Sequence, residues 1–418
     1  MATPTAAGLT SGNVWWSRTP DLEALYAVGA DPARVLEAPA PGLFLTVTTL
    51  KDPTKRGRDG QHTLEAFALA AGLLALGAAL VHRFGFPPLP VYLLTGLVVG
   101  ERLPVEDLEP LPSLGLLLLL FSVGLEFGPD RLRELSGKAL RAGFFDALAL
   151  PLGFLLGLLA GLDLRGALLL AGVIYISSSA VIVKLIIDLR RAANPESEVV
   201  LGVLVLEDLV IALLLALLGG QGPAGFLGGV ALALAYFLFA RFLGPRLVRF
   251  MEGLSDELVL LLGAAFTAGT ALLFHAVGAS EGVGAFLSGV IAAGLGLRER
   301  FEHLFGPVRD LGVALFFLVV GAEALGLLRG LTPWAVGLVL LGLLLKLPLN
   351  HLGGARAGLG RKRRLYSALY LVPRGEFNLV LGALALGQGY PLVAQVAVLL
   401  VLVSIPLGAL LIRYAPEI

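Results

Sequence analysis

A succession of long apolar segments constrains this chain more than any other feature of its sequence. A helix needs about 20 apolar residues to cross a hydrocarbon core of roughly 30 Å, and there it must satisfy its own backbone hydrogen bonds. The chain is therefore predicted to be an all-α polytopic membrane protein with about 13 transmembrane helices. The segments lie near residues 63–83, 86–100, 112–127, 140–160, 165–187, 198–218, 224–248, 256–277, 281–297, 308–327, 332–353, 364–387 and 390–412.

The composition excludes several other classes of protein. Of the 418 residues 57% are hydrophobic and only 15% are charged, whereas about a quarter are charged in an ordinary soluble domain. The 31 basic residues balance the 31 acidic ones, so no excess charge indicates nucleic acid as a partner. The chain has no cysteine, which excludes disulfides and thiolate metal sites. No nucleophile–base set, metal cluster or nucleotide loop stands out, so we expect neither an enzyme nor a cofactor.

Basic residues in the loops predict the orientation. They are concentrated in alternate loops, and by the positive-inside rule this side is cytoplasmic. We therefore expect a multi-pass protein of the cell (inner) membrane, with its C-terminus in the cytoplasm and the start of its first span outside. The basic residues on the predicted cytoplasmic side are Arg131, Arg133, Lys138, Arg141, Arg190, Arg191, Arg246, Arg249, Arg298, Arg300 and the run 361–364.

The first part of the chain does not fit this pattern. Residues 1–62 are not apolar enough to span, and they end in a basic stretch, 51–58, on the predicted outer side. We expect this region to be a poorly ordered terminal extension. The remaining residues, 63–418, then form one transmembrane domain.

Two pairs of similar stretches indicate an internal repeat. LLTGLVVG (93–100) is similar to FLSGVIAAG (286–294), and LLFSVGLEFG (119–128) is similar to FFLVVGAEALG (316–326). The offset of about 195 residues contains seven predicted helices, an odd number, so the second copy is expected to be inverted in the membrane. This predicts a first repeat over 63–218, a linker helix over 224–248 and an inverted second repeat over 256–412. Inverted repeats are typical of secondary transporters, whose binding site lies near the midplane.

Helix-breaking residues occur at matching positions in the fifth and twelfth segments. One is the run Ser177, Ser178 and Ser179, and the other is Pro373 to Glu376, which includes Gly375. Serines compete for backbone hydrogen bonds, and proline and glycine interrupt a helix. We expect two discontinuous helices that cross and bring their half-helix ends to the membrane centre. Alternatively, the serines serve only helix packing and the proline is a simple kink.

Charged residues lie deep in three predicted spans. Glu207 and Asp208 are adjacent near the middle of the sixth span, and Lys346 lies within the eleventh. Because such charges are costly in a bilayer, they are predicted to be functional, with the two acids binding an ion or a proton. Lys346 is expected to pair with one of them. Arg374 and Glu376, at the break in the twelfth span, are expected to pair with each other.

These stretches resemble the monovalent cation/proton antiporters of the second superfamily branch, most of all the Kef-type potassium/proton members. The resemblance covers about residues 63–412. It implies the sodium/proton antiporter-like fold, with crossing fifth and twelfth helices, a homodimer and an elevator motion. The stretches that carry it are LLLLFSVGLEF, YISSSAVIVKLI, VLEDLVIALLL, GAFLSGVIAAG, RDLGVALFFLVVGAEA and RGEFNLVL.

The resemblance also implies roles for individual residues. Asp208 matches the aspartate that carries the ion and the proton, and Lys346 resembles the lysine that pairs with the preceding acid in sodium-type members. Glu207 stands where many Kef-type members have glutamine, which leaves potassium and sodium both open. Many Kef-type proteins also carry a cytoplasmic nucleotide-binding domain. This chain has no matching glycine motif, so it is expected to be ungated or gated by a separate cytoplasmic regulatory subunit.

We therefore expect a secondary active antiporter that exchanges a monovalent cation, K⁺ or Na⁺, for protons across the cytoplasmic membrane by alternating access, and two other functions are alternatives. A sodium- or proton-coupled symporter of a small organic anion could use a similar inverted-repeat fold. Such proteins need polar side chains for the organic substrate, whereas this crossing offers serines and an acid pair, which favours a bare cation. A channel or scaffold protein would not explain two carboxylates and a lysine at mid-depth.

Overall fold

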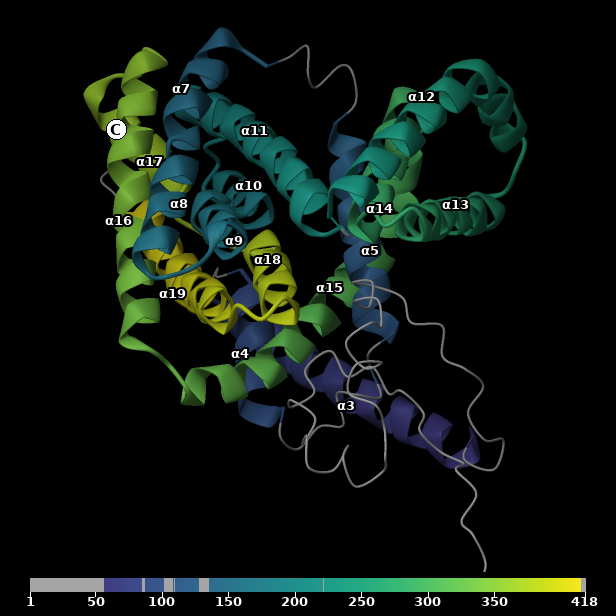
Figure 1. Ribbon diagram of the computed structural model, residues 1–418, viewed down its shortest axis with the longest axis horizontal. Coiled ribbons are helices and arrows are strands. Elements are labelled where there is room, and N and C mark those ends of the chain that lie inside the picture. The colour runs from purple at the N-terminus through teal and green to yellow at the C-terminus, as the bar shows by residue number, and fades with distance from the viewer. Residues whose placement is uncertain are drawn as a thin grey trace, which may run out of the picture.

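The computed structural model describes residues 56–84, 87–100, 108, 110–127, 135–220 and 222–414, and these are helical without any strand. Its longer helices are α3 (Arg56–His82), α4 (Leu89–Val99), α5 (Pro110–Glu126), α7 (Gly137–Ala147), α8 (Ala149–Leu159), α9 (Leu164–Tyr175), α10 (Ser179–Asp188), α11 (Pro195–Leu218), α12 (Gly222–Glu252), α13 (Asp256–Ala276), α14 (Glu281–Gly294), α15 (Arg298–Arg329), α16 (Pro333–Arg356), α17 (Arg361–Tyr370), α18 (Glu376–Gly387) and α19 (Pro391–Tyr414) (Figure 1).

Each of the thirteen predicted segments corresponds to a helix or a broken helix. Helices α7 and α8 form the fourth segment, α9 and α10 the fifth, and α17 and α18 the twelfth. In the described part of the chain, nine spans have the length and composition to cross a membrane, and four shorter apolar helices accompany them. The predicted extension 1–62 differs at its end, since α3 already begins at Arg56; residues 1–55 lie outside the described residues.

Polar side chains fix where several helices begin. An oxygen of each capping residue accepts a hydrogen bond from the backbone N–H three residues later, which satisfies a donor that the helix itself cannot. This occurs at the start of α7, α9, α10, α13 and α16. The residues that cap in this way are Ser136, Asp163, Ser178, Ser255 and Thr332.

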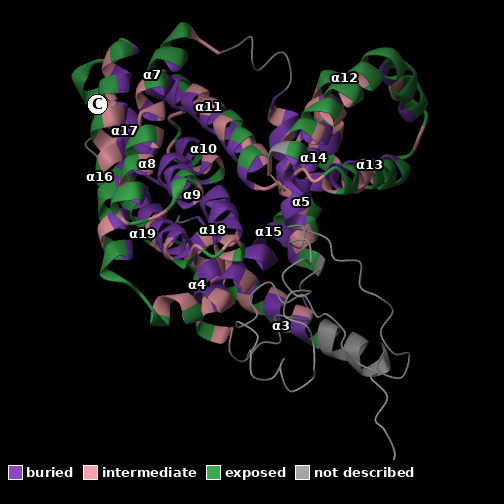
Figure 2. Cartoon of the chain, in the orientation of Figure 1, coloured by how far each residue is buried: buried purple, intermediate pink, exposed green. Residues whose placement is uncertain are grey.

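The helices form two groups, which we call the core group and the panel group (Figure 1). The core group contains α7 to α11 with α16 to α19, and within it α7 contacts α11 and α16 while α9 contacts α18. The panel group contains α3 to α5 with α12 to α15, and within it α5 contacts α14 and α15 while α4 contacts α15. Buried residues concentrate around α9, α10, α11 and α18, in the middle of the core group (Figure 2).

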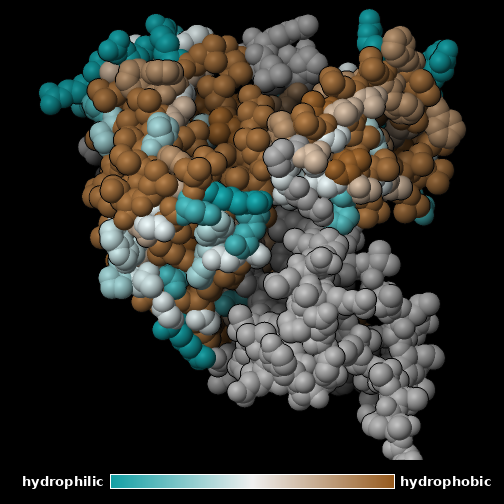
Figure 3. Space-filling view, viewed as in Figure 1, coloured by the Kyte–Doolittle hydropathy of each residue, from teal (hydrophilic) through white to brown (hydrophobic). Residues whose placement is uncertain are grey.

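The outside of the molecule is apolar, as expected of a chain surrounded by lipid. Figure 3 shows a face that is mostly hydrophobic over both groups of helices. On α12 the large side chains Phe237, Phe242 and Phe250 are 48%, 68% and 60% exposed. A few charged side chains, in contrast, lie in the interior of the core group, where Lys346 and Arg374 are fully buried. This inversion of the usual soluble arrangement identifies a multi-pass membrane protein.

Glycines let the helices of the panel group pack backbone to backbone. A side chain at Gly115 on α5 would overlap the backbone of Gly312 on α15. A Cβ at Gly124 would lie 3.0 Å from the Cα of Gly289, and one at Gly96 would lie 2.9 Å from the Cα of Gly321. Small residues of this kind are typical of close contacts between membrane helices.

Candidate functional site

Two helix breaks meet in the middle of the core group. The fifth span is interrupted between Tyr175 and Ser179, and the twelfth between Tyr370 and Glu376. The backbone N–H of Ser178 donates to the carbonyl of Pro373 over 2.9 Å, and the Ser177 hydroxyl oxygen lies 3.2 Å from the carbonyl oxygen of Leu371. The discontinuous helices therefore cross in contact, as the sequence predicted.

Glycine and asparagine hold this crossing together. A side chain at Gly375 would overlap Ser178, so only glycine allows the two breaks to approach this closely. The buried Asn378 amide donates to the carbonyls of Val173 and Ile176, over 2.6 and 3.3 Å, and accepts from the Gly375 N–H over 2.8 Å. Asn378 thus forms hydrogen bonds with backbone N–H and C=O groups at the breaks of both discontinuous helices. It lies two residues after the predicted break but was not predicted to belong to the site.

The ends of the half-helices carry partial charges that buried side chains balance. Helices α9 and α17 end in the interior, where their last carbonyls form negative poles. Lys346 Nζ donates to the carbonyl of Tyr175 at the end of α9 over 2.7 Å. Arg374 Nη1 donates to the carbonyl of Leu371 at the end of α17 over 2.8 Å. At the opposite pole, the start of α18, the first residue is the acid Glu376.

A buried ion-pair network surrounds Lys346. Its ammonium contacts the carboxylate of Glu207 over 2.7 Å and also the carboxylate of Asp146 on α7. Glu207 further accepts hydrogen bonds from the N–H and the hydroxyl of Ser177, over 2.5 and 3.0 Å. Of the two acids that the sequence offered as partners of Lys346, the structure therefore selects Glu207.

Sequence reasoning missed Asp146 and its neighbour Asn350. Asp146 is fully buried, and its carboxylate also accepts from the amide of Asn350 over 2.8 Å. Two signals could have identified them. Asp146 is an acid in the middle of the fourth apolar segment, and Asn350 follows Lys346 by four residues, which places both on one face of a helix.

The expected pair of Arg374 and Glu376 is wrong. Among the described side chains, Arg374 donates to the hydroxyl of Ser177 over 3.0 Å, whereas Glu376 accepts from the hydroxyl of Ser178 over 3.1 Å. Arg374 still belongs to the non-helical break, while Glu376 is the first residue of α18, so their side chains leave the backbone in different directions. Ser179, the third predicted serine, begins α10 and is only partly buried.

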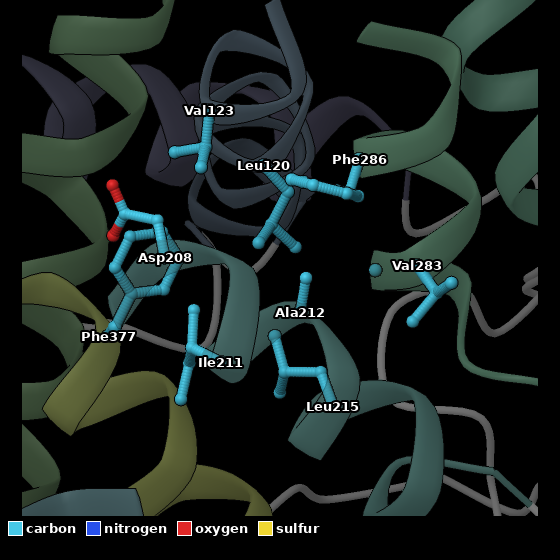
Figure 4. A pocket seen from close by; sticks show the side chains of 10 residues that line it. Leu120, Val123, Asp208, Ile211, Ala212, Leu215, Val283, Phe286 and Phe377 are labelled. Atoms are coloured by element: carbon cyan, nitrogen blue, oxygen red, sulfur yellow. The ribbon is translucent and has the colours of Figure 1, made fainter. Parts of the chain in front are cut away.

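Asp208 lies outside the network, although it follows Glu207 directly. It is 4% exposed and borders a cavity of about 10 Å³ between α5, α11, α14 and α18, which has room for about one water molecule. The cavity is otherwise apolar, and Figure 4 shows the carboxylate beside Val123 and the ring of Phe377. Among the described residues, no side chain donates a hydrogen bond to Asp208 or forms an ion pair with it. Nor do the described residues contain a group of three or more His, Cys, Asp or Glu suited to a resident metal ion.

Comparison with known proteins agrees with this geometry. The chain is 31% identical over 386 residues to the K⁺/H⁺ antiporter subunit KhtU of Bacillus subtilis, a match that covers 85% of this chain and 94% of that protein. It is 32% identical over 353 residues to the ammonium/H⁺ antiporter subunit AmhT of Alkalihalophilus pseudofirmus, covering 80% and 89% of the two chains.

A solved structure shares the fold. The sodium proton antiporter MjNhaP1 of Methanocaldococcus jannaschii superimposes with a TM-score of 0.63 at 17% identity, over 84% of this chain and 96% of that one. The fold predicted from the sequence is thereby confirmed. Residues 70–413 also match the family described as sodium/hydrogen exchanger, transmembrane. The match extends over the helices that build the crossing, the ion-pair network and the Asp208 cavity, and we conclude that the chain belongs to the sodium/hydrogen exchanger family.

Proposed function

We propose that this protein is a secondary active antiporter that exchanges a monovalent cation for protons, with Asp208 as the group that binds each in turn. The observation that carries this proposal is the position of Asp208. It is an acid without an ion-pair partner among the described residues, in the middle of a membrane span and beside a cavity of about 10 Å³. A carboxylate in such a place is available to a proton or to a small cation.

A single carboxylate is sufficient to couple the two fluxes. When Asp208 is ionised it can hold one monovalent cation, and when it takes up a proton that cation must leave. The protonated carboxyl then releases its proton on the other side before a new cation binds. Since the site never holds both, transport of one ion in each direction follows from competition alone.

Alternating access requires two arrangements of the same site, and we infer an inverted repeat that provides them. Glycine contacts support it. Gly96 and Gly289 occupy equivalent positions in the repeated stretches, as do Gly124 and Gly321, so the contact of Gly96 with Gly321 is the counterpart of that of Gly289 with Gly124. On this basis we retain repeats over 63–218 and 256–412, joined by the helix at 224–248.

A third glycine pair supports the same symmetry. Gly115 and Gly312 are separated by the same number of residues as Gly124 and Gly321, and they contact each other where α5 crosses α15. A residue that contacts its own counterpart lies on a twofold axis. We infer that such an axis passes between α5 and α15 in the plane of the membrane.

We further propose a setting for the protein. Basic loops favour the cell membrane with a cytoplasmic C-terminus. Exposed apolar side chains on α12 leave surface for lipid or for the second copy of a homodimer. Two relatives are named antiporter subunits, which favours a separate regulatory partner. Potassium is the first choice of cation because a relative that matches most of the chain is named as a K⁺/H⁺ antiporter.

The experiment uses purified protein in liposomes with an imposed pH gradient and a pH-sensitive dye inside. Potassium, sodium, lithium and choline are added in turn, and collapse of the gradient by an alkali cation but not by choline is expected. Asp208→Asn should abolish the collapse while leaving the protein folded. The matched control is Asp188→Asn, which changes an exposed aspartate paired with Lys184 on α10. Equal exchange by Asp208→Asn and the wild type would exclude Asp208 as the binding group.

A further inference from the structure

Asp146 is a buried acid that has no role in the exchange mechanism proposed for Asp208. It is fully buried on α7, one residue before this helix ends, and the backbone turns into α8 at Leu148. One of its oxygens receives both the Lys346 ammonium and the Asn350 amide. The Asn350 amide also donates to the carbonyl of Lys346 over 3.1 Å, so this part of α16 is fixed against α7.

The charges of the network balance only if Asp146 is included. Lys346 contacts Glu207 and Asp146, and Arg374 is joined to Glu207 through the hydroxyl of Ser177. The network thus contains two acids and two cations, all almost completely buried. Without Asp146 it would hold one excess positive charge in a medium that screens charge poorly.

Other charged groups around Asp146 do not change this balance. On α16 the guanidinium of Arg356 lies 5.7 Å from the centre of the Phe145 ring, where it stacks instead of pairing with Asp146. On α7 itself Arg141 donates to the carbonyl of Gly137, one turn back towards the start of the helix. On α9, Tyr175 presents its ring to Lys346 at 4.9 Å. The acids of the network therefore face two buried cations, Lys346 and Arg374.

Asp208 would respond to an excess charge in the network. It directly follows Glu207 on α11, and the charged groups that act on it are acids on three helices, Glu126, Glu207 and Glu376. No basic group belongs to this set, so an excess positive charge in the network, next to Glu207, would act on Asp208 with the opposite sign to these acids. It would favour the ionised form of Asp208 and repel an incoming cation.

We propose that Asp146 is a positioning residue for exchange. It is the permanent counter-ion of Lys346 and keeps the net charge of the ion-pair network at zero. The network then exerts no net electrostatic field on Asp208 when Asp208 binds a proton or a cation. This inference rests on the proposed role of Asp208. Asp146 itself touches neither the cation nor the transported proton. It acts through Lys346, which it holds between α7, α9 and α11 in both halves of the transport cycle.

The test compares the pH dependence of exchange in liposomes for the wild type and four variants. Asp146→Asn keeps the shape of the side chain but leaves one excess positive charge beside Glu207, the residue that precedes Asp208 on α11. With an effective dielectric constant of about 20, this should move the pH of half-maximal exchange down by about one unit. Asp146→Glu retains the charge and should keep the wild-type value even if the rate falls. Asp188→Asn on α10 serves as the control and should not shift it.

The fourth variant separates charge balance from a structural role. Asp146→Asn combined with Lys346→Met leaves Glu207 and Arg374, which balance each other, so the pH of half-maximal exchange should return to the wild-type value. If Asp146 were only structural, Asp146→Asn would lower the rate of exchange without a pH shift, and the double variant would exchange more slowly still. Should Asp146→Asn fail to fold, the double variant and Asp146→Glu still decide, because a shifted value in either overturns the inference.

The wild type distinguishes the two proposals. If the wild type shows no cation-dependent exchange, the proposed function is wrong. If the wild type exchanges normally and Asp146→Asn has the same pH of half-maximal exchange, the proposed function stands and only the role of Asp146 is refuted.

Discussion

Replacing Lys346 by methionine tests the energetics of the buried network. Methionine has nearly the same length and fills the same space without a charge. The change removes the ammonium that Glu207 and Asp146 share and leaves the carbonyl of Tyr175 without its donor. Glu207 keeps the two donors of Ser177, and Asp146 keeps only Asn350.

The expected cost follows from the burial of these groups. Removing one partner of a buried ion pair typically costs about 3–5 kcal/mol, because the remaining charge is left uncompensated. The entropy of unfolding is roughly 2.1 cal/mol/K per residue, so for the roughly 340 residues that the structure describes each kcal/mol lowers the melting temperature by about 1.4 °C. We therefore expect Lys346→Met to lower the melting temperature by about 4–7 °C.

The assay is thermal unfolding of purified protein in detergent, with Lys184→Met as the matched control. Lys184 pairs with Asp188 over 3.2 Å at an exposed position on α10, and such a surface pair contributes about 0–1 kcal/mol. A melting temperature for Lys346→Met no lower than that of Lys184→Met would refute the reasoning.

Two further predictions concern the packing of the panel group and the start of α9. Gly115→Ala should lower the melting temperature because its Cβ would overlap the backbone of Gly312, whereas Gly269→Ala, with open space around it, should be neutral or slightly stabilising. A Gly115→Ala protein as stable as the wild type would contradict the direct contact of α5 with α15. Asp163 caps α9, and hydrogen bonds from the Gly166 N–H and the Tyr390 hydroxyl lower its pKa. The cap therefore stabilises the protein above the unfolded-state value of about 4 and is lost as the pH falls through the lowered pKa. The difference in melting temperature between the wild type and Asp163→Ala should accordingly vanish in acid; a constant difference would argue against ionisation as its cause.

Much of the fold could be predicted because membrane helices follow from local sequence. Apolar length alone located all thirteen helical segments, nine of which are long enough to span a membrane in the described part of the chain, and breaks in two segments followed from a serine run and from Pro373 with Gly375. The crossing of these breaks was predicted from their matching positions in the two similar parts of the sequence. The start of the first helix was predicted too late, since residues 56–62 are polar and helix propensity there carries no apolar signal.

The site was predicted only in part because its contacts depend on which helix faces are apposed. Sequence placed Glu207, Asp208 and Lys346 at similar depths, but only the structure turns Glu207 towards Lys346 and Asp208 towards the cavity. Adjacent residues on a helix point about 100° apart, so one of the two had to face elsewhere. Arg374 and Glu376 were misassigned for the same reason, because the backbone changes from extended to helical between them.

The buried network has a consequence for how the chain is made. Its two acids, Asp146 and Glu207, are synthesised long before its two cations, Lys346 and Arg374. A nascent chain that has inserted only its first six spans therefore contains carboxylates with no basic partner in the bilayer. Neutral, protonated carboxyls cost far less there than ions do. The two acids of the first half are thus expected to gain their counter-ions only when the eleventh and twelfth spans arrive, and this pairing would then hold the two halves of the chain together.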